Sequence, residues 1–432
     1  RDLHGSEHSF PTRRSPDLAL IFTASCTPEV EDAFDKPSPD RIAEAISETK
    51  DILTAAPNGW KMAYQGSGGF GGFNILCKFD KEDNVFCEEE SDHAKATSHY
   101  TVQQGQGVLL SFDSFNAALH KYSDPVGKIN GKSVGKDGKG FQGDFEFRVM
   151  SCTKDSIVLE GRKHGDRVVM TPMPEDLTWD SFFTQIATVA SGMSSERYNI
   201  IIDKDTLPAR MNLHTLHTTD KNGKAVAIPF IYTPQGIEVL KADSLNGRKL
   251  TAFTYSTDDK WVDPNDKSVM LSPRDITPLE AFFSDNWTIN VGYSSTAEMN
   301  VWKAAAAYAA SKNMEIVTVY FSTTPGFLSL SSYVGDNWGN LRTLYSTSGK
   351  DQITIKGFRP NPKGTANERN GAVFYNQYKL KDIANTFLVN GQATDYTLSI
   401  DNPKHPLWLR MTSNSHDEVS FVFYRGIWSA DF

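Results

Sequence analysis

The spacing of apolar residues changes near the start of the chain from a helical to a strand-like period. Between Pro39 and Pro57 the apolar positions recur at helical spacing: Ile42, Ile46, Ile52 and Leu53. This spacing predicts one amphipathic helix that ends at Pro57-Asn58-Gly59. From Trp60 onward, short segments alternate apolar and polar residues and are separated by Gly, Asp and Asn: WKMAYQ, FNILCKF, VFCEEE, HYTVQQ, GVLLSF, FEFRVM, SIVLEG and RVVMTPM. Such segments predict an antiparallel meander.

The same order of helix and strands then recurs. A helix is predicted over residues 179–191, and strands follow up to residues 258–278, which are rich in Asp, Pro and Ser and read as a linker. Ser295 and Glu298 have the spacing of a capping box, so a helix is expected from about Thr296 to Lys312. Further strands are expected after it, among them AVFYN at residues 372–376.

This pattern predicts an α+β fold that is mainly antiparallel β. We expect two tandem β modules of lipocalin-like or barrel-like character, each with one or two helices, at residues 40–257 and 279–432. Two similar segments, KDSIVLEG at residues 154–161 and KDQITIKG at residues 350–357, favour a duplicated module. The alternative is two unrelated β domains.

The N-terminal 26 residues are interpreted as a non-native segment followed by the remnant of a signal peptide. Residues 1–18 are polar, lack hydrophobic periodicity and resemble translated sequencing-adapter sequence, so they are left out of the fold prediction. The following ALIFTASC resembles the end of a lipoprotein signal peptide, with Cys26 as the residue that receives lipid. The alternative is a buried strand with a chance cysteine. Residues 27–39 are expected to form an acidic tether.

Composition narrows the classes of function. The 44 basic and 53 acidic residues give a net charge of −9, and no basic block stands out, so a nucleic-acid partner is not expected. No run of apolar residues approaches the ~18 residues of a membrane-spanning helix, so membrane association would require an anchor.

Several motifs resemble one known family. The segments GWKMAYQGSGGFGGFNILCKF, LLSFDSFNAALHKYSDP, GDFEFRVM and IVLEGRK occur in the order found in a group of Bacteroidota surface lipoproteins, the domain of unknown function 4302. The resemblance runs from about Asp32 to the C-terminus. It implies a place on the outer membrane, beside a TonB-dependent transporter and its substrate-binding lipoprotein. It implies no catalytic residues.

Two motifs that could indicate a cofactor or a metal site are better explained as a turn and a strand of the fold. Residues 66–71 match GxGxxG, but a strand rather than a helix is predicted after them, so they indicate a hairpin turn. His214 and His217 would point to opposite faces of a strand. We therefore expect neither a cofactor nor a metal site.

Cys77 and Cys87 are expected to lie directly opposite each other, because they are placed symmetrically about the turn at residues 80–84. Facing residues of antiparallel strands are close enough for a disulfide. Buried free thiols are the alternative.

An irregular segment holds the best candidates for ligand binding. Aromatic, amide and histidine side chains gather in residues 112–122, and the second half of the chain has two similar aromatic residues. The candidates are Phe112, Asp113, Phe115, Asn116, His120, Tyr122, Trp338 and Tyr345. Aromatic faces next to polar edges suit sugars or other polar rings. The alternative is a packed loop.

Two functions remain open. The first, which we favour, is a surface lipoprotein that is not an enzyme and that binds or helps to capture a glycan, a peptide or a small ligand for uptake. The second is an extracellular hydrolase that acts on a glycan or peptide polymer.

Overall fold

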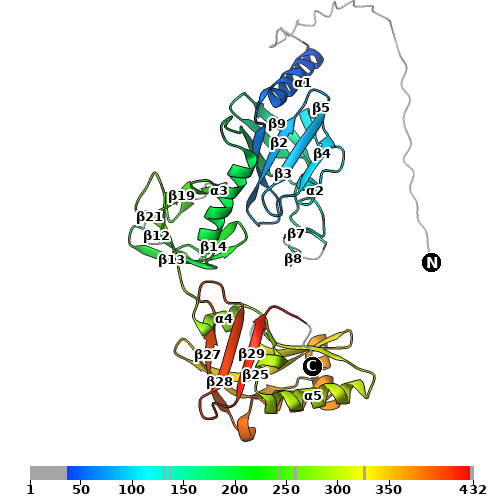
Figure 1. Ribbon diagram of the computed structural model, residues 1–432, viewed down its shortest axis with the longest axis vertical. Coiled ribbons are helices and arrows are strands. Elements are labelled where there is room, and N and C mark those ends of the chain that lie inside the picture. Colours follow the sequence, from blue (N-terminus) through cyan, green and yellow to red (C-terminus); the bar gives the residue numbers. More distant parts are fainter. Residues whose placement is uncertain are drawn as a thin grey trace, which may run out of the picture.

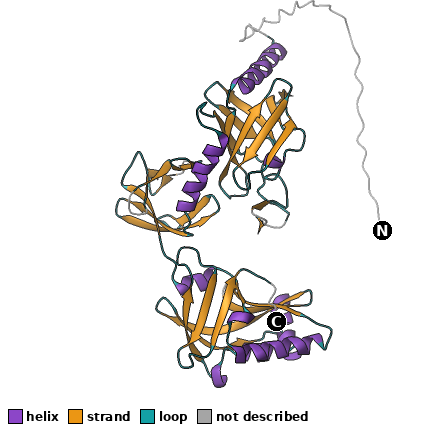
Figure 2. Cartoon of the chain, in the orientation of Figure 1, coloured by secondary structure: helices purple, strands orange, loops and turns teal. Residues whose placement is uncertain are grey.

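The computed structural model describes residues 37–129, 132–135, 138–241, 244–256, 260–324 and 327–428. Three large antiparallel sheets follow one another along this part of the chain, accompanied by short helices (Figures 1 and 2). The predicted fold class, α+β with tandem barrel-like modules, is therefore confirmed.

The first sheet follows helix α1 (Ser38–Ala55) and has nine strands in the order β4-β3-β2-β1-β11-β10-β9-β6-β5. Its strands are β1 (Trp60–Gln65), β2 (Gly72–Phe79), β3 (Asn84–Glu89), β4 (Lys95–His99), β5 (Thr101–Gly105), β6 (Gly107–Ser111), β9 (Glu146–Cys152), β10 (Ile157–Gly161) and β11 (Arg167–Pro172). Because β11 pairs with β1, the order is that of an up-and-down barrel left open between β4 and β5. Helix α2 (Ala117–His120) and the hairpin of β7 (Lys128–Ile129) and β8 (Lys132–Ser133) lie between β6 and β9.

The second sheet is a closed barrel preceded by helix α3 (Trp179–Gly192). Its eight strands are β12 (Arg197–Ile202), β13 (Asp205–Asn212), β14 (Thr215–Thr219), β15 (Ala225–Thr233), β16 (Gly236–Val239), β19 (Ala252–Tyr255), β20 (Trp261–Val262) and β21 (Val269–Pro273). A small hairpin of β17 (Ser244–Leu245) and β18 (Arg248–Lys249) lies between β16 and β19.

The third sheet is also a closed barrel, and helix α4 (Pro278–Ser284) precedes it. Its eight strands are β22 (Trp287–Ile289), β23 (Ile316–Thr324), β24 (Phe327–Val334), β25 (Asn337–Ser348), β26 (Gln352–Arg359), β27 (Thr394–Ile400), β28 (Trp408–Ser413) and β29 (Ser420–Arg425). The remaining helical elements occupy two of its connections: η1 (Val291–Tyr293) and α5 (Thr296–Ala310) after β22, and α6 (Ala366–Gln377), α7 (Leu380–Asn385) and η2 (Val389–Gly391) after β26.

The sheets do not divide the chain at the expected module boundaries. Residues 40–257 contain the first sheet and most of the second barrel, and residues 258–278, expected to be a linker, contain β20 and β21. These strands close the second barrel by pairing β21 with β12. In this segment Asp, Pro and Ser form the turns on either side of two short strands. The segment as a whole therefore has the composition of a linker, although it contains strands.

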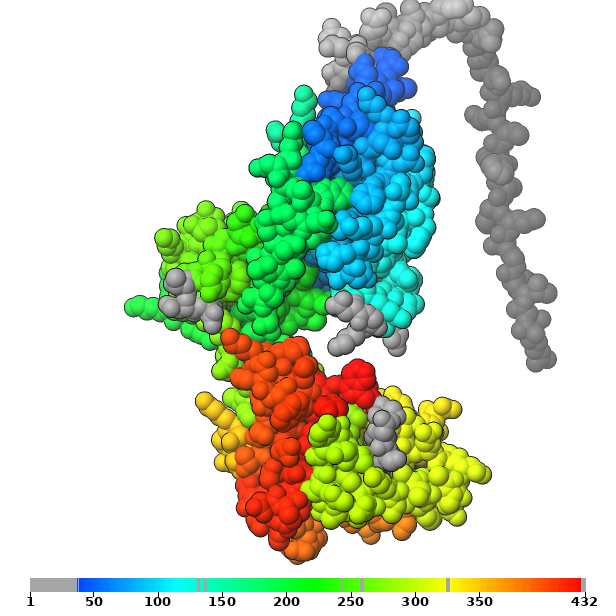
Figure 3. All heavy atoms as spheres, viewed as in Figure 1, coloured from blue at the N-terminus to red at the C-terminus, as the bar shows by residue number. Residues whose placement is uncertain are grey.

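Each sheet has its own hydrophobic core, and the first sheet and the second barrel each contribute a residue to the other's core, with Leu213 of the second barrel packed against the first core. Leu76 of β2 is fully buried among the core residues of the second barrel, together with Phe182 and Ile186 of α3. The first sheet and the second barrel thus bury apolar side chains against each other. Figure 3 shows them as a continuous blue-to-green surface.

Two local predictions for the third barrel are corrected by the structure. Residues 372–376, expected to be a strand, lie in α6, whose N-terminus has a capping box formed by Thr365 and Glu368. The box predicted at Ser295 and Glu298 does not form, because the Ser295 hydroxyl instead accepts from the Ser420 N–H of β29 and donates to the Ser420 carbonyl (2.8 Å). Helix α5 is present, but no side chain caps it.

Candidate functional site

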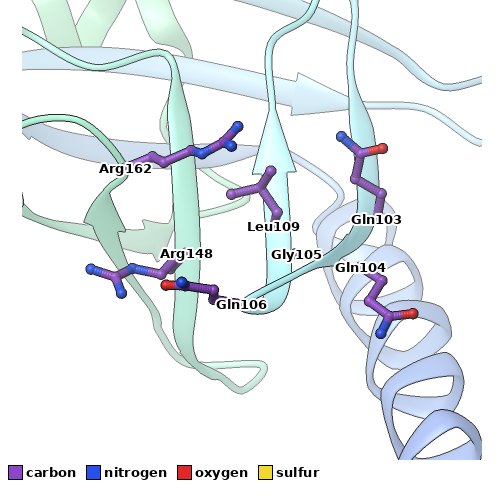
Figure 4. Close-up of a pocket in the computed structure, with 7 residues that line it drawn as sticks. All are labelled: Gln103, Gln104, Gly105, Gln106, Leu109, Arg148 and Arg162. Atoms are coloured by element: carbon purple, nitrogen blue, oxygen red, sulfur yellow. The ribbon is translucent and has the colours of Figure 1, made fainter. Parts of the chain in front are cut away.

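A polar groove on the outer face of the first sheet is the candidate site (Figure 4). It has a volume of about 460 Å³ and lies across β5, β6 and β9 and the residue after β10. Its lining is Gln103, Gln104, Gly105, Gln106, Leu109, Arg148 and Arg162.

Strand register builds the groove. Leu109 of β6 pairs with Gln103 on one side and with Arg148 on the other, so the three side chains form one row across the sheet. Neighbouring core residues Leu110 and Phe147 point to the other face, into the interior. Leu109 is only 6% exposed although it faces outward, and it lies between Gln103 and the two arginines. An apolar floor is therefore bordered by amides and guanidinium groups.

A tight turn brings a third glutamine to the groove. Gly105 pairs with Gly107, which leaves Gln106 alone at the tip of the β5–β6 hairpin. Gly107 has a φ of 91°, a conformation that glycine adopts without steric cost. The turn therefore adds Gln106 to the lining of the groove, outside the row of Gln103, Leu109 and Arg148.

The charges of the groove are balanced. Arg148 donates to Glu160 at 2.5 Å, and Arg162 donates to Glu146 at 3.0 Å. The Nε atom of Arg148 is buried and has no hydrogen-bond partner among the described residues. Because each guanidinium already has a carboxylate partner, the groove as a whole suits a neutral polar molecule rather than an anion.

An exposed aromatic cluster lies at the end of the same strands. Phe115 and His120 have ring centroids 5.4 Å apart, and His120 stacks on Phe145 at 4.9 Å. Phe115 is 76% exposed and Phe145 is 40% exposed. The amide N–H of Phe112, directly after β6, donates to the Phe145 carbonyl, so the cluster continues the β6–β9 ladder that carries the groove. Partial burial lowers the pKa of His120, which favours its neutral ring.

Three of the predicted ligand-binding residues instead support the fold. Phe112 is fully buried in the first core. Asn116 caps α2 by accepting from the Ala118 amide and donates to the Ser98 hydroxyl. Tyr122 is buried and donates to Glu89 at 2.6 Å. The structure places these side chains in or under the sheet, away from solvent.

Asp113 and the two candidates in the third barrel make their contacts with residues outside the aromatic cluster. Asp113 pairs with the His99 ring at 2.8 Å on the surface of the first sheet. Trp338 is stacked on Tyr333, whereas Tyr345 contacts the ring of Phe283. An odd separation along β25 puts Trp338 and Tyr345 on opposite faces, so the structure does not bring them together.

The predicted cysteine register is present. Cys77 and Cys87 are paired residues of β2 and β3, both are fully buried, and their Sγ atoms are 3.2 Å apart. Burial raises the pKa of the Cys77 thiol. Cys26, the predicted lipidation site, lies outside the described residues.

The groove residues are absent from the sequence-based candidates. The sequence predicts only strands around Gln103 and Leu109. The one feature that could have indicated a binding site is the run QQGQG, which places three glutamine side chains at a glycine-rich hairpin. The arginines of the groove come from strands much further along the chain, so their meeting with these glutamines follows only from strand order.

Comparisons with known proteins give one informative match. A family model described as Domain of unknown function (DUF4302) matches residues 30–257, more than half of the 432 residues. No curated protein matches the chain. The beta chain of DNA polymerase III from Streptococcus pneumoniae aligns at 8% identity over 90% of this chain and 97% of its own, with a TM-score of 0.14. The isotype 1 transferrin binding protein B from Neisseria meningitidis aligns at 11% identity over 85% of this chain and 75% of its own, with a TM-score of 0.13. Scores this low carry no argument about fold or function.

Proposed function

From the premise that this chain belongs to the DUF4302 family, we propose that it is a surface lipoprotein that captures a neutral glycan for uptake. The polar groove of the first sheet is the proposed binding site. The observation that carries the proposal is the row of Gln103, Leu109 and Arg148, which sets an apolar floor between hydrogen-bonding side chains.

The chemistry of the groove supports a sugar ligand. Sugar hydroxyls need both donors and acceptors, and each glutamine amide supplies both. The C–H face of a pyranose ring is apolar and fits against Leu109. The aromatic cluster of Phe115, His120 and Phe145 offers stacking faces for a second sugar unit further along the same strands.

The ion pairs of the carboxylates near the groove favour ligand binding over hydrolysis. Glycoside hydrolysis uses one carboxyl group that holds a proton and a second that is free to act as nucleophile or base. The described lining of the groove includes no carboxylate, and the two that contact its arginines, Glu146 and Glu160, are held in ion pairs. We therefore propose a protein that holds its ligand unchanged.

The proposed location comes from the N-terminal sequence. A lipid on Cys26 would anchor the chain at the outer membrane, and the acidic residues after it resemble the surface-export tag of Bacteroidota lipoproteins. None of the helices that the structure describes is apolar and long enough to cross a bilayer. A TonB-dependent transporter and its substrate-binding lipoprotein are the proposed partners; no nucleic acid is expected to bind.

A panel of neutral and acidic oligosaccharides and of short peptides tests the ligand class. We expect a neutral oligosaccharide to bind the full chain without turnover, and Gln103→Ala and Gln106→Ala each to weaken binding by roughly tenfold through the loss of hydrogen bonds. Gln185→Ala, an exposed glutamine on α3, is the matched control. Preference for an acidic sugar or a peptide would contradict the neutral-glycan assignment, and turnover of any member would favour the hydrolase.

Substitution in the aromatic cluster shows whether the site extends beyond the groove. Phe115→Ala is expected to weaken binding of longer oligosaccharides more than that of disaccharides. Tyr255→Ala, which removes a comparably exposed ring in the second barrel, should leave both affinities unchanged.

A further inference from the structure

A second groove lies between helix α3 and the β3–β4 hairpin of the first sheet, which are side by side in Figure 1. Its volume is about 630 Å³. The helix contributes residues three or four positions apart, from Asp180 to Ser191, so one face of α3 lines the groove. At a rise of 1.5 Å per residue this face is about 16 Å long. The groove therefore has the shape for an elongated molecule.

One end of the groove holds an ammonium group between two carboxylates. The Nζ atom of Lys95 lies 3.2 Å from Glu88 Oε1 and 3.9 Å from Asp180 Oδ1. Glu88 and Lys95 are paired residues of β3 and β4, so strand register fixes the carboxylate of Glu88 in the wall. The Glu88 side chain is only 4% exposed, whereas that of Lys95 is 50% exposed and can turn into solvent. The place of Nζ then accommodates the ammonium group of a ligand.

The face of α3 offers hydrogen-bond acceptors along the rest of the groove. The Thr184 hydroxyl donates to the Asp180 carbonyl at 2.8 Å. The hydroxyls of Thr188 and Ser191 donate in the same way to carbonyls one turn earlier in the helix, at 2.9 and 2.8 Å. Because each O–H is used within α3, the three oxygens present only lone pairs to a ligand. A molecule with several donors would satisfy them.

Apolar surface lies between these hydroxyls. Phe183 and Ala187 line the groove on the same face of α3, and the ring of Phe183 is held edge to face by His93, with centroids 5.3 Å apart. Methylene groups of a ligand would remove the exposed Ala187 from water. The carbonyl end of α3, just after Ser191, carries a partial negative charge that favours a second cationic group there.

We propose that this groove binds a linear polyamine. One primary ammonium group replaces the Nζ atom of Lys95 between Glu88 and Asp180. The methylene segments pack on Phe183 and Ala187, and the remaining ammonium groups donate to the hydroxyl row of α3. This site shares no lining residue with the polar groove and does not depend on the proposed glycan function.

Calorimetric titration of the full chain with spermidine tests the proposal. 1,8-Diaminooctane has the same number of atoms between its terminal amines but lacks the central ammonium, and octylamine keeps only one ammonium. We expect spermidine to bind most tightly and octylamine at least about tenfold more weakly, because it loses charged hydrogen bonds. If spermidine does not bind, or if octylamine equals it, the assignment is wrong.

A charge-matched pair of variants separates a built site from general attraction of a polycation to an acidic protein. Glu88→Gln should weaken spermidine by roughly tenfold. Glu238→Gln, which makes the same change of charge at an exposed residue of β16, should leave the affinity unchanged. Equal losses in the two variants would contradict a site at Glu88. Far-ultraviolet circular dichroism confirms that each variant is folded.

Lys95 gives a test that a loss of folding cannot imitate. Lys95→Met keeps an unbranched side chain and removes the competing ammonium, so spermidine should bind at least about threefold more tightly. Lys78→Met, at an exposed residue of β2, is the control for the change of charge and should have a smaller effect. Unchanged or weaker binding in Lys95→Met would show that the ligand does not take the place of this ammonium, and would overturn the proposal.

Discussion

At the scale of single residues, Cys77 and Cys87 give a direct test of where the protein resides. Their buried Sγ atoms, 3.2 Å apart on paired strand positions, need little movement to form a bond. In an oxidising compartment we expect both thiols to be oxidised to one disulfide, with two hydrogens passed to a disulfide-donating oxidant. Alkylation of the denatured protein, with and without prior reduction, measures this.

Cys152 is the internal control for that experiment. It is half-buried, and none of the other described cysteines is paired with it. It should be alkylated without reduction, whereas Cys77 and Cys87 should require reduction. Full alkylation of all three in the exported protein would show that the pair remains as buried thiols.

The residue scale also shows where sequence reasoning fails. Phe112 and Tyr122 are buried in the core, whereas Phe115, between them in the chain, is 76% exposed. The segment has no strand or helix period, so nothing in its pattern tells which rings turn inward. The cysteine pair was predictable because both residues belong to regular strands around a symmetric turn.

At the scale of elements, a buried polar cluster joins the first sheet to the second barrel. Asn74 of β2 donates to Glu90 at 2.6 Å and to the Tyr232 carbonyl of β15 at 2.9 Å. His214, from the turn between β13 and β14, has its Nδ1 atom 3.4 Å from Glu90 Oε1. Burial raises the pKa of Glu90 to about 8, with a smaller contribution from the charge of Glu89, and burial lowers the pKa of His214 to about 4.

The stability of this interface should fall between pH 6.5 and pH 8.5. Up to about pH 8, the pKa of Glu90 in the folded protein, the folded protein retains a proton on Glu90 that the unfolded chain has already lost, since the ordinary pKa is 4.5. The stabilisation lost is at most about 2 kcal/mol. The effect of His214 has the opposite sign and is confined to pH values below its ordinary pKa of 6.5, so it does not mask the change. Urea unfolding at the two pH values measures the difference.

Glu90→Gln should keep the hydrogen bond from Asn74 and remove most of this pH dependence. Glu82→Gln, which changes an exposed residue of the β2–β3 turn, should retain it. An unchanged dependence in the Glu90 variant would show that another group is responsible.

Elements with a strong local period were predictable, and those defined by tertiary contact were not. Helix α3 follows its predicted span closely because its apolar spacing is helical. Helix α5 begins at Thr296 as predicted, but its expected capping box is absent because a distant strand, β29, competes for the Ser295 hydroxyl. In α6, Gly371 packs directly on the Asn340 backbone of β25. This close approach cannot be predicted from the sequence, where the residues after Gly371 have the pattern of a strand.

At the scale of the whole molecule, an ion-pair network joins the second and third barrels. Arg425 of β29 donates to Glu196, just before β12, and to Asp285, each at 2.8 Å. Burial alone would raise the pKa of Glu196, but the hydrogen bond and charge of Arg425, together with His405, lower it. The red and orange end of the third barrel touches the green second barrel in the space-filling view (Figure 3).

Arg425→Gln should loosen this junction, because it removes the guanidinium that Glu196 and Asp285 share and leaves Glu196 with His405 and Asp285 with Arg210 at 4.0 Å. Small-angle X-ray scattering is expected to show a larger radius of gyration than for wild type. Arg359→Gln, an exposed arginine at the end of β26, is the control. The double variant Glu196→Gln/Arg425→Gln should recover part of the compaction, since fewer charges remain unpaired. Equal scattering from wild type and Arg425→Gln would show that other contacts hold the barrels.

The proposed lipid anchor depends on Cys26 and the residues after it. If Cys26 carries the lipid, residues 27–37 separate it from α1, which begins at Ser38, and a coil of this length would have a root-mean-square reach of roughly 20 Å. That reach would hold the groove of the first sheet clear of the lipid headgroups.

A chain with a complete lipoprotein signal peptide before Cys26, expressed in a Bacteroidota host, should enter the membrane fraction and be cut by protease on intact cells. Cys26→Ala should lose lipid labelling and leave the membrane fraction, whereas Cys152→Ala should retain both properties. If the unlabelled Cys26 variant stays in the membrane fraction, the anchor is a different part of the chain.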